Sequence, residues 1–270
     1  MTDATSSSAA ASQTLPLLEL RGVSKHFGGV TALDRVSLQV FAGEVVALVG
    51  DNGAGKSTMV KIMSGVLSPD DGEIRHLGRS VTLRDARDAA AIGIQTVYQD
   101  LALCNNLNTI QNLFLGREIA QPWYLGGRLI TAAMESRARK VLGELGVVIP
   151  DLGVTVGSLS GGQRQSNAIS RAVLWEARVV ILDEPTAALG VKQRRQVLEV
   201  IKRLRTENIG VVVVSHDLVE VRSVADRVVV LRLGRNVAEM RAADATHEAM
   251  VAAITGGSRD PNPAQTEPMR

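Results

Sequence analysis

The sequence predicts an α/β fold with a mainly parallel sheet, an antiparallel β subdomain and a helical subdomain. Three observations lead to this fold class. Short, almost wholly apolar runs at residues 45–49, 179–182 and 210–214 are typical of strands that are buried on both faces of a parallel sheet. Segments within 17–43 have the composition of half-buried strands, which favours an antiparallel part. A helical spacing of apolar residues within 85–150 predicts the helical part.

The composition limits the class of protein. The 270 residues are 45% hydrophobic and 21% charged, which is ordinary for a soluble globular chain. A net charge of +2 and an aromatic content of 3% supply neither a strong positive field nor a stacking surface, so we expect no nucleic acid as a partner. Cys104 is the only cysteine, which excludes an internal disulfide and a cysteine-cluster metal site. No apolar run approaches the roughly 18 residues of a membrane-spanning helix.

The two ends of the chain are expected to be flexible. Residues 1–16 are rich in Ser, Ala and Thr and carry no Lys or Arg, which is not the pattern of a secretory signal. Residues 257–270 include three prolines. We therefore expect flexible tails at 1–16 and 257–270 around one folded region at 17–256.

The folded region begins with segments that predict an antiparallel sheet. Residues 17–23 are mostly apolar, and residues 36–40 alternate between apolar and polar side chains, as a half-buried strand does. Residues 73–75 follow the turn sequence Ser-Pro-Asp-Asp-Gly at 68–72 and supply a further strand. This sheet should flank the glycine-rich loop at residues 50–57.

Residues 50–57, with the sequence G-D-N-G-A-G-K-S, match the G-x-x-x-x-G-K-S pattern of a phosphate-binding loop. The glycines allow the backbone N–H groups to turn inward around phosphate oxygens. Lys56 would reach the β- and γ-phosphates, and the Ser57 hydroxyl would ligate Mg²⁺. A chance glycine-rich turn is the alternative, but a strand precedes this segment and a helical apolar spacing follows it, which favours a phosphate site at a helix N-terminus. The predicted nucleotide-binding residues here are Gly50, Asp51, Asn52, Gly53, Ala54, Gly55, Lys56, Ser57 and Thr58.

Residues 85–150 are expected to be mostly helical. Five apolar residues fall on one helical face, namely Met134, Ala138, Val141, Leu142 and Leu145. A short β-like run ends at residues 97–100, which include Gln99. Trp123 and Trp175 are most simply interpreted as packing residues.

Leu-Ser-Gly-Gly-Gln at residues 159–163, the signature segment, begins the next helix. A serine before two glycines at a helix start makes a second N-terminus that is suited to an anion. A simple capped helix start is the alternative interpretation.

Two further apolar strands end in side chains that suit phosphate chemistry. The strand at 179–182 leads into Asp183, which suits Mg²⁺, and Glu184, which suits the deprotonation of a water molecule. An ordinary acidic turn is the alternative, and the presence of a phosphate-binding loop makes it the weaker one. The strand at 210–214 leads to His216. Because the carboxyl ends of parallel strands meet at one edge, we expect His216 to share a rim with Lys56 and Asp183. A helix over 191–205 and a hairpin over 226–237, with its turn at 234–236, complete the chain.

This ordered set of motifs resembles the ATP-binding subunit of an ABC transporter over about residues 17–256. The signature segment is the most specific part of the resemblance. The resemblance implies a P-loop NTPase core, a helical subdomain at about 100–175, and ATP and Mg²⁺ as cofactors. It also implies an ATP hydrolase that works as a homodimer, or beside a paired ATPase subunit, because two chains would enclose two ATP molecules head to tail.

The resemblance also implies roles for individual residues. Phe27, whose position alone leaves core packing and adenine stacking equally open, would stack on adenine. Gln99 would touch Mg²⁺ and the attacking water and relay the nucleotide state to a membrane partner. Glu184 would be the general base, and His216 would hold the γ-phosphate and Glu184 in register. The residues expected to serve the ATP of the opposite subunit are Ser160, Gly161, Gly162 and Gln163.

Residues 25–33, 99–103, 114–118 and 184–192 are similar to ATPases of bacterial simple-sugar importers of the ribose, xylose and fructose type. This finer resemblance implies an integral membrane permease and an extracytoplasmic sugar-binding protein as partners, with this chain peripheral at the cytoplasmic face of the inner membrane. An ABC ATPase for another cargo, such as an amino acid, a metal or an exported compound, is the alternative. Gly190 stands where the wider family has Asp, which puts the contact of that Asp with the opposite subunit in doubt.

Overall fold

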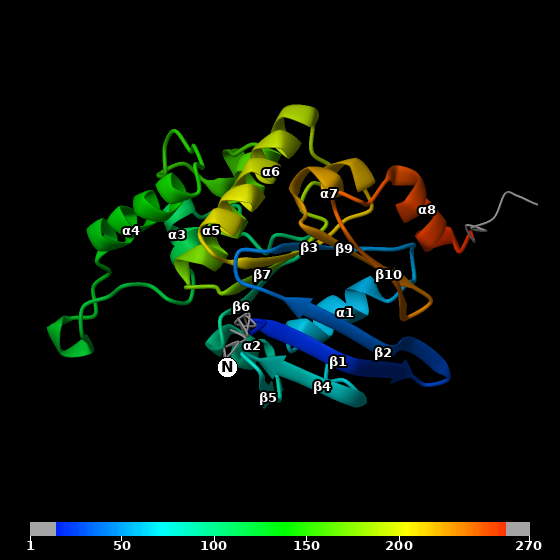
Figure 1. The fold of residues 1–270 in the computed structure, drawn as a ribbon. Helices are drawn as coiled ribbons and strands as arrows, with labels where there is room; N and C mark the ends of the chain where they lie inside the picture. Colours follow the sequence, from blue (N-terminus) through cyan, green and yellow to red (C-terminus); the bar gives the residue numbers. More distant parts are fainter. Residues whose placement is uncertain (1–14, 258–270) are drawn as a thin grey trace, which may run out of the picture.

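The computed structural model describes residues 15–257, in which a six-stranded sheet forms the centre (Figure 1). The strand order is β10-β9-β3-β8-β7-β6. The strands from β6 to β9 pair in parallel, and β10 pairs antiparallel with β9. This arrangement confirms the three apolar runs as buried parallel strands. The strands are β3 (Val45–Val49), β6 (Ile94–Val97), β7 (Val179–Asp183), β8 (Gly210–Val214), β9 (Arg227–Arg232) and β10 (Arg235–Arg241).

A second sheet, in the order β2-β1-β4-β5, is antiparallel throughout, as the sequence predicts. Helix α1 (Lys56–Met63) lies between the two sheets, and its Met59, Val60, Ile62 and Met63 are buried in a cluster with apolar side chains of both. The strands of this second sheet are β1 (Leu18–Phe27), β2 (Val30–Val40), β4 (Asp71–His76) and β5 (Arg79–Val81).

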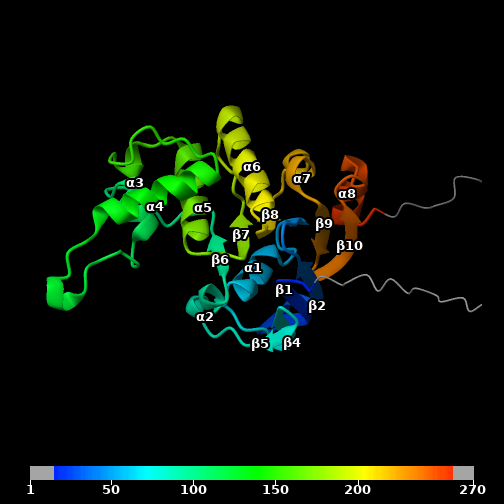
Figure 2. The same cartoon turned by 60° about the vertical axis from the view of Figure 1, so that its left-hand side comes forward.

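The opposite face of the six-stranded sheet is covered by helices that follow the strands in the chain (Figure 2). Side chains alternate along each strand, so Val46 and Leu48 of β3 face α1, whereas Ala47 and Val49 face α7 and α8. Helices α3, α4 and α5 gather at one end of the molecule (Figure 1). The helices are α2 (Ala86–Ala91), α3 (Thr109–Phe114), α4 (Thr131–Glu144), α5 (Gly161–Leu174), α6 (Val191–Thr206), α7 (Leu218–Val224) and α8 (His247–Thr255), with 3₁₀ turns at Trp123–Leu125 and Val156–Ser158.

The prediction that 85–150 is mostly helical is wrong. Helix α4 forms with its predicted apolar face buried, but residues 98–108 and 115–130 are mainly irregular. The buried side chain of Asn112 organises the first of these segments, because its amide bonds the N–H and C=O of Cys104 and the carbonyls of Leu107 and Asn108 at 2.8–3.2 Å. Local side-chain bonds of this kind compete with helix formation.

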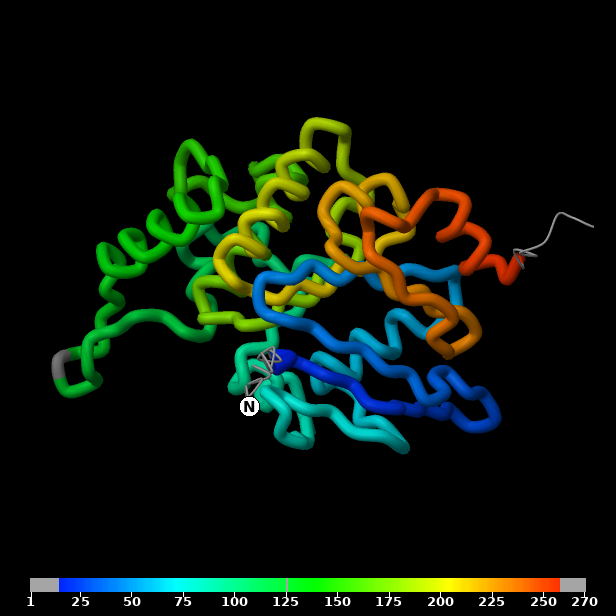
Figure 3. The backbone as a smooth tube through the Cα atoms, viewed as in Figure 1, coloured from blue at the N-terminus to red at the C-terminus, as the bar shows by residue number. Residues whose placement is uncertain are grey.

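The second irregular segment, 115–130, projects from the helical end as a long arm between α3 and α4 (Figure 3). Trp123 lies on this arm with 87% of its surface exposed, so its interpretation as a packing residue is wrong. Trp175 does pack, edge to face against Phe114 at 5.8 Å, and its indole N–H donates to the carbonyl of Leu113. Apolar character alone therefore does not distinguish the two tryptophans.

The C-terminal hairpin forms, but its turn is at Leu233 and Gly234, one residue earlier than predicted. The predicted tails fall outside the described residues, apart from residues 15, 16 and 257. In the described part of the chain, no helix is both long and apolar enough to cross a membrane.

Candidate ATP site

The predicted phosphate loop connects β3 to α1, at the carboxyl edge of the central sheet. Gly50 has φ +155°, and a Cβ on it would lie 2.3 Å from the carbonyl oxygen of Leu231 in β9. Only glycine fits this conformation and this close approach. The ammonium of Lys56 donates to the carbonyls of Gly50 and Asp51 at 2.8 and 2.9 Å, so the start of the loop folds back onto the Lys56 side chain.

A cavity of about 270 Å³, called the phosphate cavity below, borders this loop. It brings together the predicted groups on the loop and both carboxylates at the end of β7, although Gly50 and Asp51 themselves lie outside its lining. The lining residues are Val30, Thr31, Ala32, Asn52, Gly53, Ala54, Gly55, Lys56, Ser57, Thr58, Asp183, Glu184 and Val214.

Burial shifts the pKa values of two charged groups in this cavity, lowering one and raising the other. It lowers the pKa of the Lys56 ammonium, although Glu184, Asp51 and Asp183 oppose this effect. Burial raises the pKa of Asp183, and the neighbouring Glu184 adds to the rise. The Ser57 hydroxyl and the Asp183 carboxylate are hard oxygen ligands of the kind that Mg²⁺ prefers. Within the described residues no three His, Cys, Asp or Glu side chains form a metal cluster, so Mg²⁺ at this edge would need phosphate and water oxygens as well.

Glu184 and His216 lie side by side at the ends of β7 and β8. The Nδ1 of His216 is 3.3 Å from Oε1 of Glu184, and the histidine side chain is 71% exposed. Glu184 also has φ +49°, a left-handed conformation that is uncommon for a residue with a side chain. A second cavity of about 110 Å³ is also lined by Glu184, which therefore borders both cavities. The expected rim of Lys56, Asp183 and His216 is thus present, with Glu184 linking its two halves.

Three predicted parts of the site lie away from the phosphate cavity of the same chain. Phe27 is 48% exposed near the tip of the β1–β2 hairpin, where its strand partner Val30 does line the cavity. Gln99 is exposed two residues beyond β6. The signature segment begins α5, and none of its residues lines the cavity.

The signature segment is held by a reciprocal cap. Ser160 Oγ accepts from the N–H of Gln163 at 3.3 Å, and Gln163 Oε1 accepts from the N–H of Ser160 at 3.0 Å. The two glycines between them allow α5 to lie close to α6 and to the residue Leu189 that precedes it. A Cβ on Gly162 would lie 3.0 Å from Cβ of Gln193, and one on Gly161 would lie 2.8 Å from Cδ2 of Leu189.

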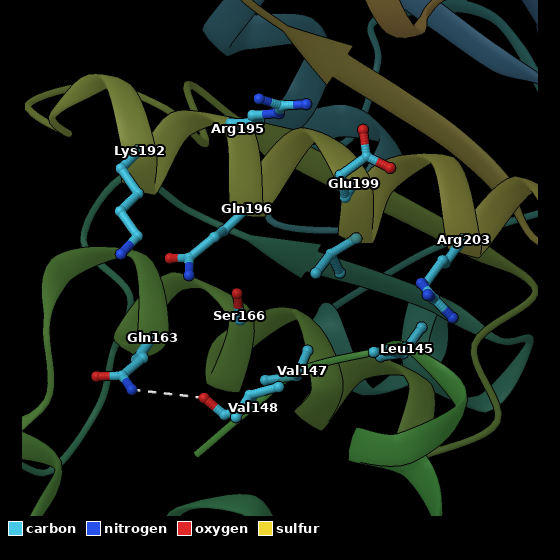
Figure 4. A pocket seen from close by; sticks show the side chains of 12 residues that line it. Leu145, Val147, Val148, Gln163, Ser166, Lys192, Arg195, Gln196, Glu199 and Arg203 are labelled. Carbon is cyan, nitrogen blue, oxygen red and sulfur yellow. Dashed lines mark hydrogen bonds between the residues drawn. The ribbon is translucent and has the colours of Figure 1, made fainter. Parts of the chain in front are cut away.

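A further cavity of about 510 Å³ lies between α5, α6 and the chain after α4 (Figure 4). Gln163 borders it and donates from Nε2 to the carbonyl of Val148 at 3.4 Å, and Lys192 and Gln196 extend toward it from α6. This cavity is separate from the phosphate loop, since the two linings share no residue.

The sequence interpretation missed residues that support the site from elsewhere in the chain. The N–H of Gly234 donates to the carbonyl of Ala54 at 3.0 Å, and the carbonyl of Gly234 accepts from the N–H of Asp34 at 2.8 Å. The turn of the β9–β10 hairpin thus supports the phosphate loop. Thr31 and Ala32 line the cavity from β2. The sequence analysis places Thr31 and Ala32 only in a family-like segment and Gly234 only in a turn, because their support of the site depends on contacts between distant parts of the chain.

Comparison with known proteins gives the same family as the motifs. A family profile described as ABC transporter matches residues 33–187. The fructose import ATP-binding protein FrcA of Rhizobium meliloti is 46% identical, over 92% of this chain and 97% of that protein. The xylose/arabinose import ATP-binding protein XylG of Sulfolobus acidocaldarius is 45% identical, over 81% of this chain and 86% of that protein.

Solved structures agree with these sequence matches. A nucleotide-free ATP-binding cassette from an ABC transporter superposes with a TM-score of 0.74 at 24% identity, covering 89% of this chain and 96% of that chain. A dimeric ATP-binding cassette in a post-hydrolysis state, bound to ADP and Pi, gives a TM-score of 0.68 at 27% identity, covering 83% and 98%. The chain belongs to the ABC transporter family, as one of its ATP-binding cassettes.

Proposed function

We propose that this chain is the ATP-hydrolysing subunit of an importer for a simple sugar. The observation that carries the proposal is the convergence of Lys56, Asp183 and Glu184 on one cavity, with His216 at 3.3 Å from Glu184. A cation for the phosphates, a carboxylate suited to Mg²⁺ and a second carboxylate that can position water are groups that support in-line attack of water on a phosphate.

In this proposal the loop N–H groups and Lys56 bind the phosphates, and Ser57 and Asp183 would hold Mg²⁺, which would neutralise charge on the phosphate oxygens. Glu184 orients and deprotonates the attacking water. His216 would hold Glu184 and the γ-phosphate in register, and Gln99, two residues beyond β6, would contact Mg²⁺ and the water when they are bound. Catalysis is then electrostatic positioning rather than covalent chemistry.

The signature segment is proposed to act on the ATP of a second copy. Its capped N-terminus suits a phosphate, yet it lies away from the phosphate cavity of its own chain. A head-to-tail pair of chains would bring Ser160 and Gly162 of one copy to the ATP of the other. Phe27, exposed on the β1–β2 hairpin, would stack on the adenine.

The cargo and the partners are proposed from the relatives. Proteins named for fructose import and for xylose/arabinose import are 46% and 45% identical to this chain. A permease in the membrane would carry the sugar, an extracytoplasmic binding protein would deliver it, and this chain would lie at the cytoplasmic face. ATP would shift the permease between two states through the difference in binding energy.

The substitution Glu184→Gln tests the hydrolysis mechanism. The amide keeps the shape of the side chain but not its basicity, so ATP binding should persist while hydrolysis is lost. Glu176→Gln is a matched control, because the Glu176 side chain is 90% exposed and borders none of the described cavities near the site. Turnover near the wild-type rate in Glu184→Gln would remove Glu184 from the role of base.

The same variant tests the cargo. Tagged Glu184→Gln protein with Mg-ATP should retain its partners from native membranes, and mass spectrometry would identify them. A multi-spanning permease together with a sugar-binding protein is the expected result. A permease of another class would overturn sugar import and leave the ATPase proposal intact.

A further inference from the structure

The loop between β7 and α6 has an unusual backbone conformation. Glu184 and Ala188 both have positive φ, +49° and +58° respectively, although neither is glycine. Left-handed conformations at such residues are unfavourable and persist only where the surrounding structure holds them. The groups that hold this loop therefore also determine where the Glu184 carboxylate lies.

Arg194, in the first turns of α6, contacts this loop and the next one. Its Nε donates to the carbonyl of Leu189 at 2.8 Å. Its Nη1 lies 3.4 Å from a carboxylate oxygen of Asp217 and 3.4 Å from one of Glu220. One planar cation thus joins the loop that carries Glu184 to the segment that follows His216.

The acceptors of Arg194 are themselves fixed in place. Glu220 also accepts a hydrogen bond from the hydroxyl of Thr186, which lies two residues after Glu184. Asp217 caps α7 by accepting from the N–H groups of Val219 and Glu220 at 3.0 and 3.1 Å. These connections close a ring from the Glu184 loop through Glu220 and Arg194 to the His216 loop. Thr186, Arg194, Asp217 and Glu220 of this ring line the 110 Å³ cavity, whose lining includes no residue of the phosphate loop.

We propose that Arg194 is a positioning residue for ATP hydrolysis: it keeps the Glu184 loop and the His216 loop at the separation in which Glu184 and His216 meet. The inference rests on the proposed role of Glu184 as base. Arg194 lines the 110 Å³ cavity and not the phosphate cavity, so it acts on the placement of Glu184 rather than on ATP binding.

The first test is the kinetics of Arg194→Gln. Loss of the cation should lower kcat for ATP by about tenfold to a hundredfold, the penalty typical of misplacing a reacting group by about 1 Å. The dissociation constant for ATP should stay within about twofold, because Lys56 and the phosphate loop are untouched. Arg195→Gln is the matched control, since Arg195 is the adjacent arginine and is exposed. Arg194→Lys should fall between, because an ammonium is a point charge and lacks the planar fork that reaches three acceptors.

A structural defect alone would lower the melting temperature and ATP affinity together with kcat. A second pair of variants covers the case in which Arg194→Gln does not fold. Thr186→Val removes the hydroxyl that bonds Glu220 and should also lower kcat, whereas Thr186→Ser keeps the hydroxyl and should restore it. Wild-type kcat in Thr186→Val would overturn the ring as a positioning device.

The double variant Glu184→Gln/Arg194→Gln shows whether Arg194 acts through Glu184. If it does, removing Arg194 causes no further loss of the residual rate once Glu184→Gln is present. A further loss equal to that in the wild-type background would overturn the inference. Wild-type kcat in Arg194→Gln, with Glu184→Gln inactive, would overturn it while leaving the proposed function intact. Full activity in Glu184→Gln would instead overturn the proposed function itself.

Discussion

Replacing Gly50 by alanine should cost far more stability than replacing Gly53 in the same loop. A Cβ on Gly50 would lie 2.3 Å from the carbonyl oxygen of Leu231, and the backbone has φ +155°. The oxygen belongs to the buried strand β9 and cannot move aside as a side-chain end could. Gly53 has φ +79°, but a Cβ there would meet no atom within 4 Å.

The expected magnitudes follow from these two environments. For Gly50→Ala, backbone strain of about 1–3 kcal/mol adds to overpacking of about 1–3 kcal/mol, which gives a loss of about 2–6 kcal/mol. For Gly53→Ala only the left-handed backbone matters, at about 1–2 kcal/mol. Alanine restricts the unfolded chain equally at both positions, so that contribution cancels in the comparison. Positive-φ strain is present in both variants, so the difference between them should be mainly the overpacking at Gly50, about 1–3 kcal/mol.

Urea unfolding of the two variants and the wild type, without nucleotide, measures this difference as the change in the free energy of unfolding. A loss of several kcal/mol is a large share of the roughly 5–15 kcal/mol that stabilises a typical protein, so Gly50→Ala should also give less soluble protein. Equal losses in the two variants, or a larger loss in Gly53→Ala, would refute the steric argument.

Two further predictions concern the ligands of the cavity. Lys56→Ala should weaken ATP binding by about tenfold to a hundredfold, because a charged hydrogen bond of about 1.5–3 kcal/mol is lost. The control Lys140→Ala, at an exposed position, should leave ATP binding unchanged. Unchanged affinity of Lys56→Ala in a nucleotide titration would contradict the assignment of Lys56 to the phosphates. Because Asp183 keeps its proton at higher pH than a free aspartate, protons should compete with Mg²⁺ as the pH falls through its raised pKa. Metal-dependent ATP binding should decline over that range in the wild type and lose this dependence in Asp183→Asn; a flat wild-type profile would count against Asp183 as a ligand.

The amino-acid sequence predicts the parts of the fold that local composition determines. The strands β3, β7 and β8 are runs of branched apolar residues, and the side chains that follow such runs must meet at one edge of a parallel sheet. Lys56, Asp183 and Glu184 can therefore be placed together from the order of strands and motifs along the chain.

The parts that were missed depend on contacts between distant residues. Thr186 and Glu220 are 34 residues apart, and no periodicity marks Arg194 between them. The segment before α3 is shaped by the amide of Asn112 rather than by an amphipathic pattern, so the prediction of helix for that region failed. The signature glycines were identified as an anion site, but their contact with α6 could not be inferred from residues 159–163 alone.

That contact has a consequence for exchanging parts between related cassettes. A chimaera that replaces only residues 100–175 takes the start of α5 from one protein and keeps α6 from the other. The close contact between Gly162 and Gln193 is then formed by parts of two different proteins. A cut placed after α6 would transfer both sides of this contact, and a discontinuous graft of 100–175 with 189–196 would do so with less foreign sequence. The unit that can be exchanged at this end of the molecule is therefore not a single continuous stretch of chain.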